Sequence, residues 1–103
     1  MEAEGLAFDW DDGNLEKCQK HGLSVQDIEG LFQETISVFP DPRHSNEEEC
    51  FIGLGKTEEG RSVLVVFTLR IRDAAVLIRP ISARPMHKKE IDYYEEEAAK
   101  IEK

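Results

Sequence analysis

The twelve residues 79–90, RPISARPMHKKE, gather four kinds of reactive side chain. Arg79 and Arg84 supply guanidinium groups, His87 supplies an imidazole, Glu90 supplies a carboxylate, and two lysines stand between the last two. Cleavage of RNA by attack of its own 2′-hydroxyl needs a base, an acid and cations that stabilise the charge of the phosphorane. The segment therefore predicts RNA cleavage without a metal ion, with the arginines on the phosphate and His87 or Glu90 in proton transfer.

A second interpretation is that these residues decorate an ordinary junction between a strand and a helix. His87 falls on the apolar stripe of the expected closing helix, where a hydrogen-bonded packing role is common. Lys88 and Lys89, in contrast, stand at the start of that helix, where the helix dipole disfavours cations. This conflict with local preference favours a functional reason for the two lysines.

Charge is distributed unevenly along the chain. The net charge of −9 by itself argues against a nucleic-acid-binding protein. Residues 61–90, however, hold seven Lys and Arg against two Asp and Glu, a net charge of +5, whereas residues 1–60 have a net charge of −11. We call residues 61–90 the basic segment; it also contains Arg61 and Arg70. Charge alone fits solvated strand and helix faces as well as an RNA-binding surface.

The spacing of cysteine and histidine gives little support for a metal site. Cys18 and His21 are three residues apart, which is half of a zinc site, and Cys50, His44 or His87 would have to complete it. None of these three residues has a second ligand at the usual spacing, so we expect no metal and no other cofactor. Cys18 is interpreted as an apolar helix residue. The chain also has no phosphate-binding loop, dinucleotide fingerprint or nucleophile elbow.

Two short helices are expected in the first third of the chain. The first covers residues 12–20, with an aspartate at its start as the cap, and Gly22 follows as a left-handed stop. The second covers residues 25–34, where apolar residues recur at helical spacing. Ser24 and Asp27 resemble a capping box in front of it.

The hydrophobic period then changes to that of strands. Short apolar or alternating runs predict four strands, at residues 36–39, 49–56, 62–69 and 75–83. The third run is apolar on both faces, as in a strand that is covered on both sides. Pro80 cannot donate a ladder hydrogen bond, so the fourth strand is bulged there or lies at an edge. Gly53 and Gly55, inside the second strand, indicate a bulge or a close backbone approach.

Residues 86–103 are expected to form a closing helix. Its inward stripe follows a three-four spacing through His87, Ile91, Tyr94, Ala98 and Ile101. The order of elements predicts one α+β domain over residues 1–103, with two N-terminal helices, a four-stranded antiparallel sheet and a C-terminal helix.

Composition limits the class of protein further. Hydrophobic residues make up 40% and charged residues 34% of the chain, which is typical of a small folded domain with a charged surface. No apolar stretch approaches the roughly 18 residues that span a membrane, and the acidic N-terminus does not resemble a signal peptide. Two cysteines are too few for a disulfide scaffold. We therefore expect a cytoplasmic protein that does not contact a membrane.

An ordered series of short motifs resembles the BrnT family of small toxins from prokaryotic type II toxin–antitoxin modules. Each motif alone is weak, but the ordered set is specific. The motifs are F-D-W-D at 8–11, G-N-x-x-K at 13–17, K-H-G at 20–22, P-D-P-R-H-S at 40–45, F-I-x-x-G at 51–55, G-R at 60–61, F-T-x-R at 67–70, R-P-I-S-A-R at 79–84, M-H-K-K-E at 86–90 and Y-E at 94–95.

The resemblance implies a RelE-like fold, ribonuclease activity that restrains translation, and neutralisation by a BrnA-type antitoxin encoded beside the toxin. It also implies functional residues at the matching positions, namely Lys20, His21, Arg61, Arg70, Arg79, Arg84, His87 and Glu90. Of these, His21 is an alternative acid or base if the first helix folds over the sheet. Binding of the RNA substrate is expected of Lys20, Arg61, Arg70, Lys88 and Lys89.

Two positions depart from the family pattern. Cys50 stands where relatives usually have arginine, and Pro85 stands where related sequences often have an aromatic residue. The missing arginine and the acidic first 60 residues favour an alternative, a toxin-like module with little or no activity that binds its antitoxin and contributes to operon autoregulation.

The resemblance also predicts how a partner binds. RelE-like toxins are generally inhibited by masking of their basic surface, so the antitoxin is expected to lay an acidic or amphipathic helix across the basic segment. Association of that kind is fast and sensitive to salt. Homo-oligomers, or hetero-oligomers with the antitoxin, are compatible with this arrangement.

Overall fold

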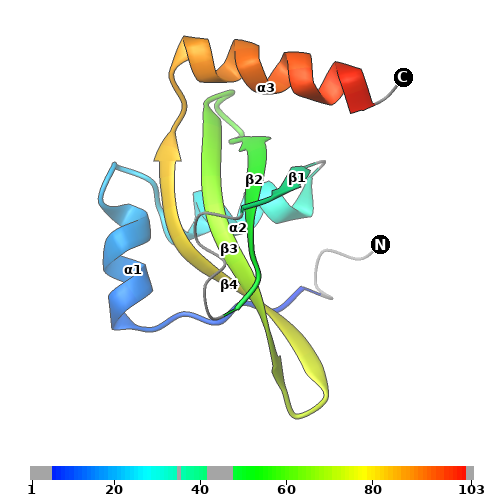
Figure 1. Ribbon diagram of the computed structural model, residues 1–103. Helices are drawn as coiled ribbons and strands as arrows, with labels where there is room; N and C mark the ends of the chain where they lie inside the picture. The colour runs from blue at the N-terminus through cyan, green and yellow to red at the C-terminus, as the bar shows by residue number, and fades with distance from the viewer. Residues whose placement is uncertain (1–5, 35, 42–47, 102–103) are drawn as a thin grey trace.

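The computed structural model describes residues 6–34, 36–41 and 48–101, the last four by their backbone alone. Two helices, four strands and a third helix follow one another, which confirms the predicted α+β fold (Figure 1). The strands form one antiparallel sheet in the order β1-β2-β3-β4. The elements are α1 (Asp12–Gln19), α2 (Val25–Gln33), β1 (Ser37–Pro40), β2 (Cys50–Lys56), β3 (Ser62–Arg72), β4 (Ala75–Pro85) and α3 (Lys88–Ile101).

Both N-terminal helices begin with reciprocal side-chain caps. The Asp11 side chain accepts a hydrogen bond from the backbone N–H of Asn14, whose side-chain oxygen accepts one from the Asp11 N–H. Ser24 and Asp27 form the same arrangement in front of α2, which confirms the predicted capping box. Gly22 has a φ of 85°, in the left-handed region that glycine adopts without a steric clash, as predicted for the stop after α1.

One face of the sheet is covered by α1 and α2 and holds the main core. The buried core residues are Cys18, Leu23, Ile28, Leu31, Val63, Val65, Phe67 and Ala83. Gly53 also lies on this face, where an added Cβ would be 2.9 Å from Cδ1 of Ile36, and at Gly55 it would be 3.3 Å from Cδ2 of Leu31. The predicted close approach at these two glycines is confirmed.

The opposite face of the sheet is only partly covered. Cys50 of β2 and Leu64 and Val66 of β3 form a smaller cluster there, against which Met86 and Tyr94 pack. In Figure 1, α2 lies behind the sheet, α1 lies beside β4, and α3 crosses one end of the sheet. Residues 63–68 of β3 are therefore buried on both sides, as the apolar run predicts, whereas Leu69 and Ile71 near its end are exposed. Part of the second face stays open between α1 and α3.

The edge strand β4 contains a β-bulge beside Pro80, so both of the alternatives predicted for this proline occur. The register shifts between Val66 and Phe67, which leaves Ile81 as the extra residue on β4. The carbonyl oxygen of Pro80 accepts a hydrogen bond from Nδ2 of Asn14 at 2.7 Å. The irregular part of β4 is thus the place where α1 is attached to the sheet.

The C-terminal helix begins two residues later than predicted. Met86 and His87 precede it, and the first helical residue is Lys88. His87 is exposed, so its predicted place on the inward stripe is wrong. The physical reason is a cap, because the Glu90 side chain accepts a hydrogen bond from the His87 N–H at 3.1 Å and so fixes where the helix starts.

Other boundaries of the prediction need smaller changes. Ile91 and Tyr94 are partly buried, in agreement with the predicted stripe, whereas the side chains of Ala98 and Ile101 lie outside the described residues, as does Pro42 in the predicted turn after the first strand. The last strand ends at Pro85 rather than at residue 83. Among the described residues, none of the three helices combines the length and the apolarity that crossing a membrane requires.

A two-residue turn joins β3 to β4, and both of its residues have positive φ. Asp73 has a φ of 53° and Ala74 a φ of 65°, the combination found in type I′ hairpin turns. Left-handed backbone costs a residue with a Cβ about 1–2 kcal/mol, whereas glycine adopts it freely. We expect Ala74→Gly to stabilise the protein by about 0.5–1 kcal/mol and to raise its thermal midpoint by about 2–8 °C.

The neighbouring alanine provides the control for this prediction. Ala75 is the first residue of β4 and does not have a positive φ, so Ala75→Gly should lower the thermal midpoint. A midpoint that falls in Ala74→Gly would contradict strain at the turn.

Candidate functional site

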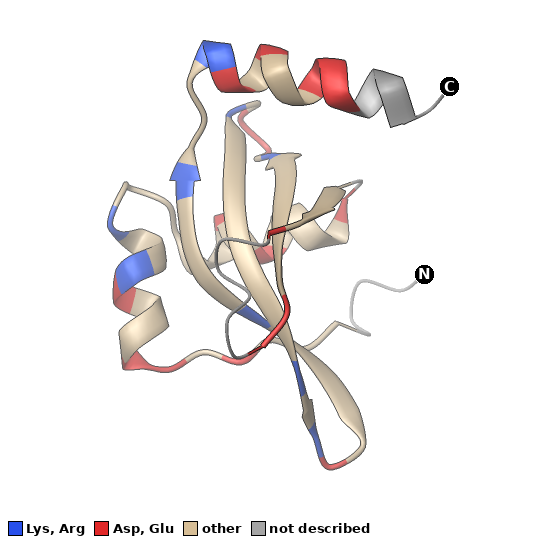
Figure 2. Cartoon of the chain, viewed as in Figure 1, with Lys and Arg blue, Asp and Glu red and all other residues tan. Residues whose placement is uncertain are grey.

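A groove of about 590 Å³ lies on the open face of the sheet. Its size is within the range of about 300–1,000 Å³ that is usual for ligand sites in proteins. Lys and Arg mark α1 and the end of β4, the two elements on its basic side (Figure 2). The groove is lined by Lys17, Lys20, His21, Pro40, Asp41, Ile52, Leu64, Val66, Ser82, Ala83, Arg84, Glu90 and Tyr94. It thus combines an apolar floor with cationic and polar walls.

Four of the residues predicted from the sequence come together in this groove. Lys20 and His21 reach it from the end of α1, Arg84 from β4 and Glu90 from the first turn of α3. The first helix packs beside the edge strand β4 and not over the open face, and the turn after it nevertheless brings His21 to the groove. Segments about sixty residues apart in the chain therefore contribute to one site.

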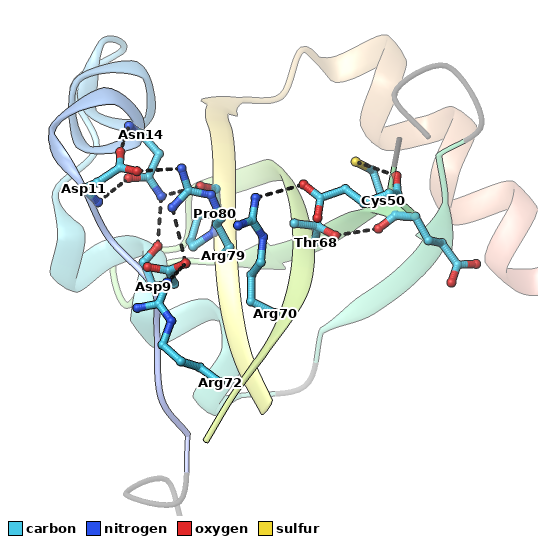
Figure 3. A network of polar contacts seen from close by, with 11 residues as sticks. Asp9, Asp11, Asn14, Cys50, Thr68, Arg70, Arg72, Arg79 and Pro80 are labelled. Carbon is cyan, nitrogen blue, oxygen red and sulfur yellow. Dashed lines mark hydrogen bonds and ion pairs between the residues drawn. The ribbon is translucent and has the colours of Figure 1, made fainter. Parts of the chain in front are cut away.

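Buried hydrogen bonds of Asn14 fix the position of α1. Its Nδ2 donates to the carbonyl oxygens of Asp9 at 3.0 Å and Pro80 at 2.7 Å (Figure 3). Because buried carbonyl groups need partners, these two bonds hold the helix against β4. Lys17 is in α1, and Lys20 and His21 are in the turn directly after it, so this attachment sets all three along the groove.

A second connection joins the segment before α1 to the sheet. Nη2 of Arg79 donates to the Asp11 carboxylate at 2.7 Å, and Nη1 lies 3.4 Å from the carboxylate of Asp9 (Figure 3). The pKa of Asp11 is lowered, first by the hydrogen bond from the Asn14 backbone and then by that from Arg79. The same hydrogen bond to Asp11 raises the pKa of Arg79. Arg79 thus fastens the N-terminal segment to β4 and does not line the groove.

Arg84 is held in the groove by a two-pronged ion pair with Glu90. Its two terminal nitrogens donate to the two carboxylate oxygens at 2.7 and 2.6 Å. The hydrogen bond from Arg84, and then that from the His87 backbone, lower the pKa of Glu90 to about 2. Glu90 is therefore a carboxylate at neutral pH, which suits it for orienting the guanidinium and leaves it without a proton to donate.

The lowered pKa of Glu90 predicts a loss of stability in acid. A carboxyl group whose pKa is about 2 in the folded protein, against an ordinary value of 4.5, stabilises the fold above pH 4.5. That contribution is lost as the pH falls from about 5 to about 2, and we expect about 1–2 kcal/mol, because the Arg84 side chain is 40% exposed and solvent screens the pair. Denaturant unfolding at several pH values measures it.

Two variants separate the contribution of Glu90 from that of the other carboxyl groups that are protonated in acid. Glu90→Gln should be less stable than the parent at pH 7 and should lose less stability between pH 5 and pH 2. Glu96→Gln, at an exposed position on α3, should follow the parent profile. Parallel profiles for the parent and Glu90→Gln would contradict the assignment.

The remaining predicted residues do not line the groove. They are Arg61, Arg70, Arg79, His87, Lys88 and Lys89. Arg70 and Arg79 share the open face with Arg84 by strand alternation and register. All three arginines are engaged by carboxylates from outside the sheet. Arg79 and Arg84 make the contacts described above, and Arg70 donates to Glu48 at 3.1 Å. The field of the basic segment is thus partly neutralised by the acidic parts of the chain.

Four polar or aromatic groove residues were missed by the sequence analysis, namely Lys17, Asp41, Ser82 and Tyr94. Two of them had a usable signal. Lys17 is three residues before Lys20 within the helix predicted for residues 12–20, and Tyr94 is four residues after Glu90 on α3. Asp41 and Ser82 had none, because only the pairing of β1 with β2 and of β4 with β3 brings them to the groove.

The two cysteines are buried thiols. Cys18 belongs to the main core, as predicted, and burial raises its pKa to about 11. Burial is also the main reason why the pKa of Cys50 is raised, followed by the charges of Glu48 and Asp41. Within the described part of the chain, which does not include His44, no three His, Cys, Asp or Glu side chains are grouped as a metal site would require.

Comparison with known proteins identifies one family. A family model described as the ribonuclease toxin BrnT of type II toxin–antitoxin systems matches residues 10–90. The matched range runs from the residue before the α1 cap to Glu90 in the first turn of α3, and so contains most of the groove. No curated protein matches the chain.

Proposed function

The chain belongs to the BrnT family of ribonuclease toxins of type II toxin–antitoxin systems, and we propose that it cleaves RNA in the groove between α1 and α3 without a metal ion. The observation that carries this proposal is the meeting of Lys20, His21 and Arg84 in one groove. They supply a phosphate-binding cation, a proton-transfer group and a guanidinium that can bind two phosphate oxygens.

In the proposed reaction the 2′-hydroxyl of the RNA attacks the neighbouring phosphorus. A base removes the 2′-proton, the bond from the 2′-oxygen to phosphorus forms, and the bond from phosphorus to the 5′-oxygen breaks. The leaving oxygen takes a proton, which gives a 2′,3′-cyclic phosphate and a 5′-hydroxyl. His21 is the proton-transfer group of the groove, because Glu90 is ionised and bonded to Arg84.

The cations have separate roles in this proposal. Arg84 binds the phosphate under attack, where charge develops, and Lys17 and Lys20 bind the phosphate beside it. The exposed side chains of Arg61, Lys88 and Lys89 lie outside the groove and contact RNA that extends beyond it. Arg70 and Arg79 hold acidic segments of the chain against the sheet.

Expression and cleavage assays test the proposal. Induction of the chain alone in bacteria should arrest growth and degrade bulk RNA, and purified protein should cleave single-stranded RNA equally well in EDTA. An Arg84→Ala preparation controls for contaminating nucleases. Normal growth with intact RNA at good expression would show that the chain is not an active ribonuclease. Loss of cleavage in EDTA would show that a metal ion takes part.

A type II toxin has a protein antitoxin as its partner, and we propose that here it is of the BrnA type and acts in the cytoplasm. An acidic or amphipathic helix of the antitoxin would cover the basic segment and the mouth of the groove. Association should slow as salt rises. A mapped interface that avoids residues 61–90 would rule out direct masking.

One observation favours a second candidate function. Because Arg70, Arg79 and Arg84 are all engaged by carboxylates within the chain, the protein can be a module that binds its antitoxin without cleaving RNA. This function would be favoured by normal affinity for the antitoxin together with the absence of RNA cleavage, or with residual cleavage that Arg84→Ala does not reduce.

A further inference from the structure

The floor of the groove is apolar, which binding of a phosphate alone does not require. Ile52, Leu64 and Val66 form it, and Leu64 and Val66 belong to the small buried cluster on this face. An RNA backbone needs only cations and hydrogen-bond donors. The apolar floor next to Arg84 is instead suited to a flat ring that has left the stack of bases.

An aromatic ring stands on the wall of the groove that α3 contributes. Tyr94 of α3 lines the groove, and its ring lies 5.6 Å from that of Phe39 and 5.0 Å from that of Tyr93. These two contacts hold the ring in place before any ligand binds. Stacking on a fixed aromatic ring is a common way in which proteins hold single-stranded bases, and it tolerates every base.

The register of the strands brings the two kinds of surface together. Arg84 pairs with Leu64 across the β3–β4 ladder, and Ser82 pairs with Val66. The cation proposed for the phosphate is therefore directly beside the apolar floor. Within one nucleotide a single ribose links the base to the phosphate, so one nucleotide can contact the apolar floor and Arg84 at the same time.

We propose that this groove is a binding site for a single unstacked nucleotide. The base lies between Tyr94 and the apolar floor, and the phosphate lies at Arg84. This inference rests on the proposed function for its biological role, since it makes the cleaved position of the RNA one that is single-stranded and free to turn its base outward. It also means that a free mononucleotide binds the protein.

Binding of adenosine 3′-monophosphate to the full chain, measured by calorimetry or NMR titration, tests this inference. This nucleotide carries the adjacent 2′-hydroxyl and 3′-phosphate of the proposed reaction. Adenosine and inorganic phosphate are the comparison ligands. We expect saturable binding of the nucleotide that is tighter than the binding of either comparison ligand. Inorganic phosphate that binds as tightly as the nucleotide would overturn the proposal and leave a simple anion site.

Substitutions at two adjacent tyrosines identify the surface that holds the base. Tyr94→Leu keeps an apolar side chain and should weaken nucleotide binding at least about fivefold, the lower end of what one base–aromatic stack contributes. Binding of inorganic phosphate should not change. Tyr94→Phe should bind the nucleotide like the parent. Tyr93→Leu is the comparison variant: Tyr93 is 55% exposed and does not line the groove, so the loss of its ring contact with Tyr94 should weaken nucleotide binding less than Tyr94→Leu does.

The outcomes separate this inference from the proposed ribonuclease function. RNA cleavage without nucleotide binding would overturn the nucleotide site and leave the ribonuclease. Nucleotide binding that depends on Tyr94, without RNA cleavage, would support the site and refute the ribonuclease. Equal loss in Tyr93→Leu and Tyr94→Leu would overturn the role of Tyr94. If Tyr94→Leu fails to fold, the affinities of the parent protein for the nucleotide, inorganic phosphate and adenosine decide whether the groove binds a nucleotide.

Discussion

Replacement of Arg84 by alanine is expected to reduce RNA cleavage by roughly 100-fold or more, the usual cost of deleting one group that stabilises a transition state. Arg84 is the cation of the groove whose position is best defined. It lies inside β4, opposite Leu64, and Glu90 holds both of its terminal nitrogens. A preorganised guanidinium meets the developing phosphorane charge without further rearrangement.

Arg84→Lys separates charge from geometry. Lysine keeps the positive charge but presents a single point charge, which cannot bind Glu90 and a phosphate through parallel hydrogen bonds. Much of the activity should therefore be lost in this variant as well. A lysine variant with parental activity would show that charge alone is needed at this position.

The ion pair with Glu90 offers a structural explanation that has to be tested on the same samples. If Arg84 only connects β4 to the start of α3, Arg84→Ala will lower the thermal midpoint while the folded fraction still cleaves RNA. If Arg84 acts on the phosphate, the folded fraction should itself lose roughly 100-fold in cleavage, in addition to the drop in midpoint that loss of the ion pair causes. Measuring the midpoint and the cleavage rate on each purified variant distinguishes the two explanations.

Local sequence signals predicted most of the fold because short-range physics decides those features. The aspartate cap of α1, the capping box at Ser24, the stop at Gly22 and the bulge beside Pro80 all depend on residues within a few positions of one another. The start of α3 was placed too early because the apolar spacing continues through His87. The hydrogen bond from the His87 N–H to the Glu90 side chain caps α3 and sets its first residue, and the spacing of apolar residues does not reveal this bond.

The site was predicted only in part because its contacts are long-range. The basic segment was read as one surface, but Arg79 is bonded to Asp11 and Arg70 to Glu48, both of them far away in the sequence. Net charge along a sequence does not show which charges meet in the fold. Tyr94 was predicted only as a packing residue for a related reason. It lines the same groove as Arg84 only because α3 crosses the end of the sheet, which the sequence pattern does not reveal.

Position 50 shows how the fold limits what a departure from the family pattern means. Cys50 is buried, and its Sγ donates to the backbone carbonyl oxygen of Glu48 at 3.7 Å. It packs with Leu64 and Val66 below the groove and does not line it. The groove of this chain therefore keeps Lys20, His21 and Arg84 without a cation at residue 50.

The two histidines of the predicted site give the second large effect. His21→Ala should lower the cleavage rate by about 100-fold or more, within the range of 10²–10⁴ that a positioned acid or base contributes. His21 lines the groove beside Lys20, in the turn that follows α1, and Asn14 fastens this helix to β4. The expected loss is in the cleavage step itself, so single-turnover rates on a short single-stranded RNA measure it.

His87→Ala is the matched control, since both histidines are exposed and only one lines the groove. His87 gives Glu90 a backbone N–H, which alanine also has, so the start of α3 and the position of Arg84 should be kept. His87→Ala should therefore stay within a few-fold of the parent, whereas His21→Ala should lose about 100-fold or more in the cleavage rate. The reverse result would place proton transfer at the start of α3. The RNA would then have to leave the groove and pass over Lys88 and Lys89 to reach it.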